Sequence, residues 1–148
     1  AIKPGDDPNI EDPAILLDDW LSSKDIAFRY KINPNLVILS ACDTAWTSSL
    51  EKPILDLPSS FRIGGAGIVV ASNWRIQDKQ TREIMNQASE FIYLNRGKKN
   101  LISEALREGK LNYIKKNQGK TFNSTFGKVD RSHPYFWGPF EIIGLPNI

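Results

Sequence analysis

The stretch Leu36-Val37-Ile38-Leu39-Ser40-Ala41-Cys42-Asp43-Thr44 decides the expected fold. It begins with an unbroken apolar run, Leu36–Leu39, between Asn33-Pro34-Asn35 and small polar residues. Such a run predicts a strand that is buried on both faces of a parallel sheet. Ligand and catalytic sites of open α/β sheets lie just beyond the carboxyl ends of such strands. Cys42, the single cysteine of the chain, follows Leu39 by three residues and falls where such a site would be.

Two roles are open for Cys42 from this spacing. Free cysteine is among the most buried residue types, so Cys42 could be a small hydrophobe at a strand end. A cysteine at the edge of a sheet is also well placed to act as a nucleophile. The spacing by itself favours the buried hydrophobe, and further residues are needed to choose between the two.

The composition excludes several classes of protein. A chain of 148 residues is long enough for one domain with a core, and its 41% hydrophobic and 24% charged residues are ordinary for a globular chain. The net charge of +2 is too small to indicate a polyanion-binding protein. No apolar run approaches the roughly 20 residues of a membrane span. One cysteine and one histidine supply neither an internal disulfide nor the four ligands of a structural zinc site.

The start of the chain also carries information. The first residue is Ala1 rather than methionine, and no signal-peptide pattern follows it. We therefore expect the chain to be a trimmed or processed piece of a longer protein.

Apolar periodicity and turn residues predict the order of elements along the chain. The first expected helix begins near Lys24, where Ser22-Ser23 can cap it and where Ile26, Ala27 and Tyr30 share one side. The later expected helices cover Ser59–Ile63, Asp78–Leu94 and Asn100–Lys116. The expected strands are 36–39, Ile68–Ser72 after a turn at 64–67, and Phe140–Gly144, with Ala14–Leu17 as an edge strand or the start of a helix. The expected loops are 1–13, 45–60 with Pro53 and Pro58 as breaks, and a mobile loop at 117–132.

This order of elements predicts the fold class. Strands separated by helices at this spacing indicate an α/β sandwich with a mainly parallel sheet flanked by helices. Three clear strands make a small sheet, and each of its edges presents unpaired backbone groups. We therefore expect an incomplete fold.

The residues around Cys42 resemble a known motif. Leu39-Ser40-Ala41-Cys42-Asp43-Thr44 is similar to the cysteine motif of the CHAT domain, a caspase-like and separase-like peptidase module usually attached to tetratricopeptide repeats. Further similarities follow in the family's order over about Leu16 to Gly144: a Gly-Ala-Gly turn at 65–67, Val69-Val70-Ala71-Ser72-Asn73-Trp74, Asp78 and Thr81, Ala105-Leu106-Arg107, His133-Pro134, and Trp137-Gly138-Pro139-Phe140. The chain departs from the family at Ala45-Trp46, where glycine often follows the motif. The ordered set identifies residues 1–148 as the C-terminal portion of a single CHAT domain with a caspase-like fold.

The resemblance implies that Cys42 is the nucleophile and donates a backbone N–H to the oxyanion hole. The base of caspase-like enzymes is a histidine that precedes the cysteine, by roughly 50 residues in caspases. No histidine precedes Cys42 in this chain. We therefore expect the base and its neighbouring glycine in a missing N-terminal portion, and the chain alone to be inactive. His133 is the remaining candidate base, but its proline and aromatic neighbours favour a packed or capping role.

The resemblance also implies how a substrate would bind. Ser72-Asn73-Trp74-Arg75 is similar to the caspase segment that pairs as a strand with an extended substrate, so Asn73 and Trp74 are substrate-binding candidates. Asp78 matches the acidic residue that faces a basic side chain before the cut, which favours cleavage after Arg or Lys. Asp78 could instead cap a helix that begins at Lys79. Asp43 is a second pocket candidate beside the cysteine or a solvated carboxylate, and Arg75 would select an acidic residue.

We therefore expect a cysteine endopeptidase that cleaves proteins, and as an alternative a non-catalytic interaction or scaffold module with the same fold. The resemblance implies a cytoplasmic protein, regulated by attached or partner tetratricopeptide repeats, without cofactor, metal or membrane. We expect no direct nucleic-acid binding, because no groove-reading motif accompanies the basic residues Arg96, Lys98, Lys99, Lys115, Lys116 and Lys120.

Overall fold

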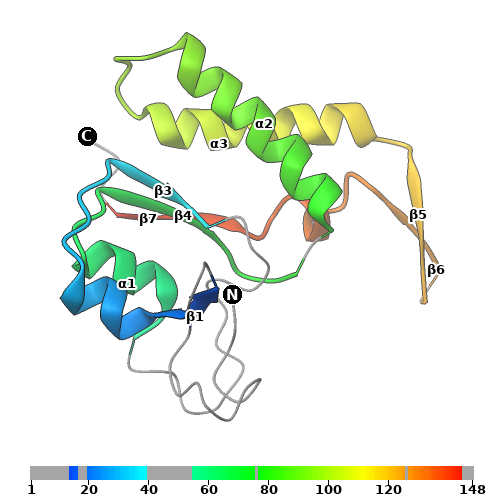
Figure 1. Cartoon of the computed structure of the whole chain (residues 1–148). Helices are drawn as coiled ribbons and strands as arrows, with labels where there is room; N and C mark the ends of the chain where they lie inside the picture. The colour runs from blue at the N-terminus through cyan, green and yellow to red at the C-terminus, as the bar shows by residue number, and fades with distance from the viewer. Residues whose placement is uncertain (1–13, 17–19, 40–54, 76, 126, 145–148) are drawn as a thin grey trace. The chain divides into compact units, whose positions relative to one another are not determined.

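The structure is a computed structural model that describes residues 14–16, 20–39, 55–75, 77–125 and 127–144 (Figure 1). It confirms the mixed α/β class. The chain divides into two compact units, one formed by Ala1–Arg75 with Phe140–Leu145 and the other by Ile76–Pro139 with Pro146–Ile148. The expected loops at 1–13 and 45–54 lie outside the described residues. The assignment of the whole chain to part of a single domain stays a prediction.

The first unit contains a three-stranded sheet and a small two-stranded one. The larger sheet has the order β3 (Leu36–Ile38), β4 (Ile68–Ser72) and β7 (Phe140–Gly144), with β3 parallel and β7 antiparallel to β4. In the smaller sheet, β1 (Ala14–Leu16) pairs antiparallel with β2 (Trp20–Ser22). The segment near Ala14 is therefore a strand, which was one of its two predicted states.

Burial differs between the two parallel strands. All five residues of β4 are buried, as its apolar run predicts. The same prediction for β3 is wrong, because Leu36 and Val37 are half-buried and Ile38 is 38% exposed. Among the described residues β3 has one neighbouring strand, β4, and no described strand pairs with its other side. The ladder continues one residue further, since the Leu39 amide donates to the Val70 carbonyl at 2.8 Å.

The core of this unit lies between β4, helix α1 (Leu57–Ile63) and the residues that lead into β3. The cluster contains the buried Ile26, Leu39, Leu57, Ala66, Val69 and Ala71. Phe61 and Ile143 pack against it. Burying one such large side chain contributes about 1.5–3 kcal/mol relative to leaving it in water.

Helix α1 begins two residues before the expected Ser59. Asp56 is its N-cap, and its carboxylate accepts a hydrogen bond from the Ser59 amide at 2.7 Å. Pro58 is therefore not a break, because it lies in the first turn, where its missing N–H has no partner to lose. The sequence signal for this start is Asp56, an N-cap residue three positions before Ser59.

The replacement Asp56→Ala is expected to lower the free energy of unfolding by about 0.5–2 kcal/mol, because the Ser59 amide loses its acceptor. Asp56→Asn is the control, since its side-chain carbonyl keeps an acceptor at the same place. Urea denaturation of both variants measures the difference. Equal losses would show that the cap does not stabilise the helix.

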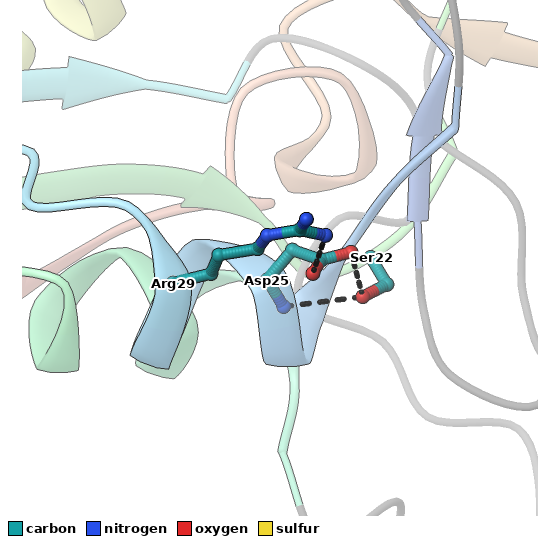
Figure 2. A network of polar contacts seen from close by, with 3 residues as sticks. All are labelled: Ser22, Asp25 and Arg29. Atoms are coloured by element: carbon teal, nitrogen blue, oxygen red, sulfur yellow. Dashed lines mark hydrogen bonds and ion pairs between the residues drawn. The ribbon is translucent and has the colours of Figure 1, made fainter.

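A short π-helical turn, η1 (Asp25–Arg29), precedes β3, and Figure 2 shows how its start is held. The Ser22 hydroxyl donates to the Asp25 carboxylate at 2.8 Å and accepts from the Asp25 amide at 3.1 Å, as the predicted serine cap requires. Arg29 pairs with Asp25 at 3.5 Å. The Ser22 hydrogen bond is the main cause that lowers the pKa of Asp25.

Ile26 and Ala27 are buried as expected, but Tyr30 is extended and 49% exposed, so its predicted place beside them is wrong.

The turn at 64–67 brings two chain segments into close contact. Gly65 has a φ of 114°, which favours glycine, and a Cβ at this residue would lie 2.3 Å from the Ile32 carbonyl oxygen. The Ile32 amide donates to the Gly64 carbonyl at 3.1 Å. The Arg62 guanidinium donates to the carbonyls of Ala66 and Gly67. This turn therefore fixes the start of β4 beside the residues that lead into β3.

The second unit is built on two packed helices, α2 (Asp78–Leu94) and α3 (Leu101–Asn117), as the sequence predicts to within one residue (Figure 1). Gly109 of α3 approaches α2 closely, because a Cβ there would lie 2.6 Å from the Ile84 carbonyl. Glu83 of α2 accepts from the buried Asn117 at 3.4 Å and pairs with Lys116 at 3.6 Å. Burial, with the Glu83 charge as a smaller cause, raises the pKa of Tyr113.

The mobile loop expected at 117–132 is wrong, because most of it forms a hairpin. Strands β5 (Thr121–Ser124) and β6 (Gly127–Asp130) pair antiparallel and place Phe122 opposite Val129. Phe122 contacts the ring of Phe136 edge-on at 5.8 Å, which gives the hairpin an apolar anchor. Asp130 accepts from the amides of Gly119 and Ser132 at 3.0 and 2.7 Å and closes its base. The hydrogen bonds from Ser132 lower the pKa of Asp130.

Candidate active site

The candidate site begins at one edge of the larger sheet. Because β3 and β4 are parallel and pair in the register Ile38↔Val70, their carboxyl ends reach the same edge. Leu39 is the last described residue after β3, and β4 ends at Ser72. Sites of open α/β sheets form at such an edge. The segments that carry Cys42 and Asn73–Trp74 therefore start side by side.

Cys42 and Asp43 lie outside the described residues, as does the departure from the family at Ala45-Trp46. Their roles as nucleophile and pocket candidate stay predictions. Leu39, the last described residue before them, is buried at 8% exposure and is tied to β4 by its amide hydrogen bond. The described structure thus fixes the point from which the cysteine segment starts.

The segment after β4 turns from buried to exposed within a few residues. Ser72 is buried and pairs in register with Phe140 of β7. Asn73 is half-buried, Trp74 is 36% exposed, and Arg75 is exposed. The exposure of Trp74 shows that its ring is not part of the core. Asn73, Trp74 and Arg75 therefore lie past the carboxyl end of β4, where they are accessible to an extended peptide.

Asp78 is the first residue of α2 and is exposed. The N-cap is Gln77, so the predicted alternative, in which Asp78 caps a helix beginning at Lys79, does not match the helix start. A carboxylate in the first turn still stabilises the helix dipole by about 0.3–1 kcal/mol. Among the described residues, Asp78 makes no hydrogen bond or ion pair. Its carboxylate is therefore not committed to a neighbour in that part of the chain.

Asp78 belongs to the second unit, whereas Asn73 and Trp74 belong to the first. Their connection is the short sequence from Arg75 to Asp78. The sharing of one pocket by these residues stays a prediction.

His133 is exposed, and its Nδ1 accepts a hydrogen bond from the Tyr135 amide at 3.2 Å. It is the N-cap of the 3-10 turn η2 (Pro134–Phe136). The predicted capping role of His133 is confirmed. A nitrogen that accepts this bond is engaged in holding the turn, so the geometry gives no support to a catalytic role.

Ser23 is predicted from the sequence to have a capping role, and no role is predicted for Gln80. Within the described residues, the Ser23 hydroxyl and the Gln80 Oε1 are buried and have no hydrogen-bond partner. Leaving such a group unpaired costs about 1–3 kcal/mol. The signal for Gln80 was its spacing, because Gln80, Ile84 and Ala88 recur every four residues on the buried side of α2.

The described ranges hold no group of three or more His, Cys, Asp or Glu side chains that could bind a metal ion. In that same part of the chain, no helix has the length and apolar character needed to cross a bilayer.

Two comparisons with known proteins bear on this site. The family model of the CHAT domain matches residues 7–145, nearly the whole chain. The match includes Cys42, the edge of the sheet and Asp78. A search of curated proteins gave no significant match.

Proposed function

Because this chain belongs to the CHAT domain family, a peptidase-related family similar to caspases and separases, we propose that it is a cysteine endopeptidase domain with Cys42 as nucleophile. The observation that carries the proposal is the place of Cys42 in the chain. It follows β3, whose carboxyl end lies beside that of β4, and the family match covers the entire sheet. Cys42 is the third residue after Leu39, and a step of three residues spans at most about 11 Å.

In the proposed reaction, the Cys42 thiolate attacks the peptide carbonyl and a thioester forms as the amine leaves. Backbone N–H groups stabilise the oxyanion, and water then hydrolyses the thioester to release the acid and the thiol. A cysteine with a pKa near 8.5 is only a few per cent thiolate at neutral pH, so a base is needed. His133 caps η2, and we propose that the base is a histidine outside these 148 residues.

We propose that the substrate binds in extended form along the segment after β4, with Asn73 and Trp74 beside it. Asp78 would hold the side chain before the cut. A carboxylate binds a guanidinium with two parallel hydrogen bonds, so arginine, and after it lysine, is the expected residue there. The lack of a partner for Asp78 among the described residues supports this role. Asp43 is a second carboxylate available to the same pocket.

The replacement Asp78→Asn is expected to lower kcat/KM for cleavage after Arg roughly 10- to 150-fold, because a hydrogen bond to a charged group contributes about 1.5–3 kcal/mol. Peptide hydrolysis by both proteins, with Arg and with Ala before the cut, measures the change in preference. The matched control is Glu90→Gln, which removes an exposed carboxylate from the same helix. Unchanged preference in Asp78→Asn would remove Asp78 from the pocket.

The experiment that tests the function uses the full natural protein together with any partner that copurifies. Fluorogenic peptides differ only in the residue before the cut, which is Arg, Lys, Asp or Ala, and each is tested with and without prior alkylation by iodoacetamide. Cleavage after Arg or Lys that alkylation abolishes is the expected result. Cleavage after Asp would assign the pocket to Arg75. A folded protein that cleaves none of the peptides would favour the non-catalytic interaction module.

A further inference from the structure

The turn between α2 and α3 lies at one end of the helix pair (Figure 1). It carries a group of exposed cationic and apolar side chains. Tyr93 and Leu94, the last two residues of α2, are 67% and 70% exposed. Arg96, Lys98 and Lys99 follow and are also exposed. We refer to these five residues as the α2–α3 tip.

The backbone of the tip is held in a defined shape. Both the amide and the side chain of Asn95 donate to the Phe91 carbonyl, at 3.0 and 2.9 Å. The Lys98 amide donates to the Asn95 carbonyl at 3.2 Å. Gly97 and Asn100 have left-handed φ values of 87° and 56°, and a non-glycine residue rarely adopts this conformation. A surface that is ordered before binding loses less entropy when a partner docks.

Local roles account for part of this group. The Arg96 guanidinium lies 4.8 Å from the centre of the Tyr93 ring, and the Lys98 ammonium lies 5.8 Å from that of Phe91. Cations near the carboxyl end of α2 also stabilise its dipole. These roles explain neither the third cation, Lys99, nor a leucine left mostly in water at the same place. Neighbouring exposed apolar and cationic side chains are typical of interaction surfaces.

The charge of the second unit indicates the kind of partner. Residues 76–139 contain 12 Lys or Arg and 6 Asp or Glu, a net charge of +6, whereas the whole chain has +2. Opposite charge steers association and fixes the orientation of a complex. Tyrosine and arginine are enriched at protein interfaces. The complementary surface is therefore acidic and carries an apolar group that covers Leu94.

We propose that the α2–α3 tip is a docking surface for an acidic segment of a partner protein that carries at least one large apolar side chain. An anionic membrane fits less well, because surfaces that bind anionic lipid usually carry roughly four to eight cations and the tip has three. Single-stranded nucleic acid also fits less well, since it needs open aromatic faces and Arg96 already lies over the Tyr93 ring. The proposal concerns a partner rather than the reaction, so it goes beyond the proposed function.

The test uses the full natural protein and a display library of short random peptides. Peptides selected by the wild type are synthesised with a fluorescent label, and their affinity is measured for three variants. The first is Arg96→Glu with Lys98→Glu and Lys99→Glu, and the second is Leu94→Ser. The matched control is Lys115→Glu with Lys120→Glu and Lys128→Glu, which changes the net charge equally at exposed positions of the same unit. All the replaced side chains are exposed, and each triple variant removes a cation near the carboxyl end of a helix, so thermal melting should fall only slightly and by a similar amount in both.

We expect the selected peptides to combine Asp or Glu with Leu, Phe or Trp. Both tip variants should bind them at least about tenfold more weakly, and the control should bind within about twofold of the wild type. Failure to enrich any peptide, or equal loss in the control, would overturn the proposal. Tighter, Leu94-dependent binding of phosphatidylserine vesicles or of an oligothymidine would also overturn it and assign the surface to lipid or nucleic acid. None of these readings depends on cleavage, so their failure leaves the proposed function unaffected.

Discussion

Peptide cleavage by the full natural protein is expected to fall by on the order of a millionfold in Cys42→Ala, to the background of the assay. This is the size of the loss in kcat when the nucleophile of a serine peptidase is removed. Alanine leaves no atom to form the thioester, whereas binding of the substrate at the proposed residues Asn73, Trp74 and Asp78 should persist. The variant is therefore expected to bind an uncleaved substrate peptide with wild-type affinity.

Two measurements separate this result from misfolding. The melting temperature of Cys42→Ala should match that of the wild type, and fluorescence anisotropy should report retained binding of a labelled Arg-containing peptide. Cys42→Ser is the second variant, because it keeps a polar atom at the site but replaces the thiol by a far weaker nucleophile at neutral pH. Cleavage by Cys42→Ala above one hundredth of the wild-type rate would show that another residue is the nucleophile.

The second large effect is expected at Gly65, where Gly65→Ala should lower the free energy of unfolding by about 3 kcal/mol or more. Two causes act together. The φ of 114° is unfavourable for alanine, a strain of about 1–3 kcal/mol. The added Cβ would also lie 2.3 Å from the Ile32 carbonyl oxygen, so the backbone itself must move. The hydrogen bond from the Ile32 amide to the Gly64 carbonyl lies beside this contact and would be disturbed.

The matched control is Gly97→Ala. Gly97 also has a positive φ, 87°, but no atom lies within 4 Å of the Cβ that alanine would add. Its loss should be limited to conformational strain of about 1–2 kcal/mol. Urea denaturation of the two variants separates strain from steric overlap. Equal losses would mean that the turn relaxes around the new methyl group.

The sequence predicted those elements whose signal is repeated along the chain. In α2, apolar residues recur at helical spacing from Ile84 to Ile92, over about two and a half turns, and Ile84 and Ala88 are buried as that spacing requires. In β4, an unbroken apolar run sits between turns and is fully buried. Because several residues carry each of these patterns, misreading one residue does not change the predicted element.

The sequence misled where one or two residues carry the signal. Each strand of the β5–β6 hairpin contributes one facing apolar residue, Phe122 or Val129, which is too little alternation to distinguish a strand from a polar loop. The contact that holds Phe122 comes from Phe136, and no local pattern predicts it. The start of α1 depends on the single N-cap residue Asp56, and Pro58 in the first turn resembles a break in the sequence pattern.

The sequence predicted the candidate site in part, as it did the fold. The sheet edge followed from the apolar runs, and the resemblance of the cysteine motif is borne out at the level of the family. The sequence places Asp78 at the start of α2 and leaves open whether it caps the helix. The structure shows that Asp78 is the first helical residue and that Gln77 is the N-cap. The burial of Gln80 depends on tertiary packing, which its polarity alone could not indicate.

The pairing of β7 with β4 has a consequence for biosynthesis. Ser72 lies opposite Phe140, so all of residues 73–139 must be translated before the second neighbour of β4 exists. At about 5–20 residues per second, this takes roughly 3–13 s, far longer than hairpin formation on the microsecond scale. During that interval β4 presents a row of unpaired amides and carbonyls on the nascent chain. The first unit therefore completes its sheet late in translation, and this strand is where a ribosome-associated chaperone would be needed.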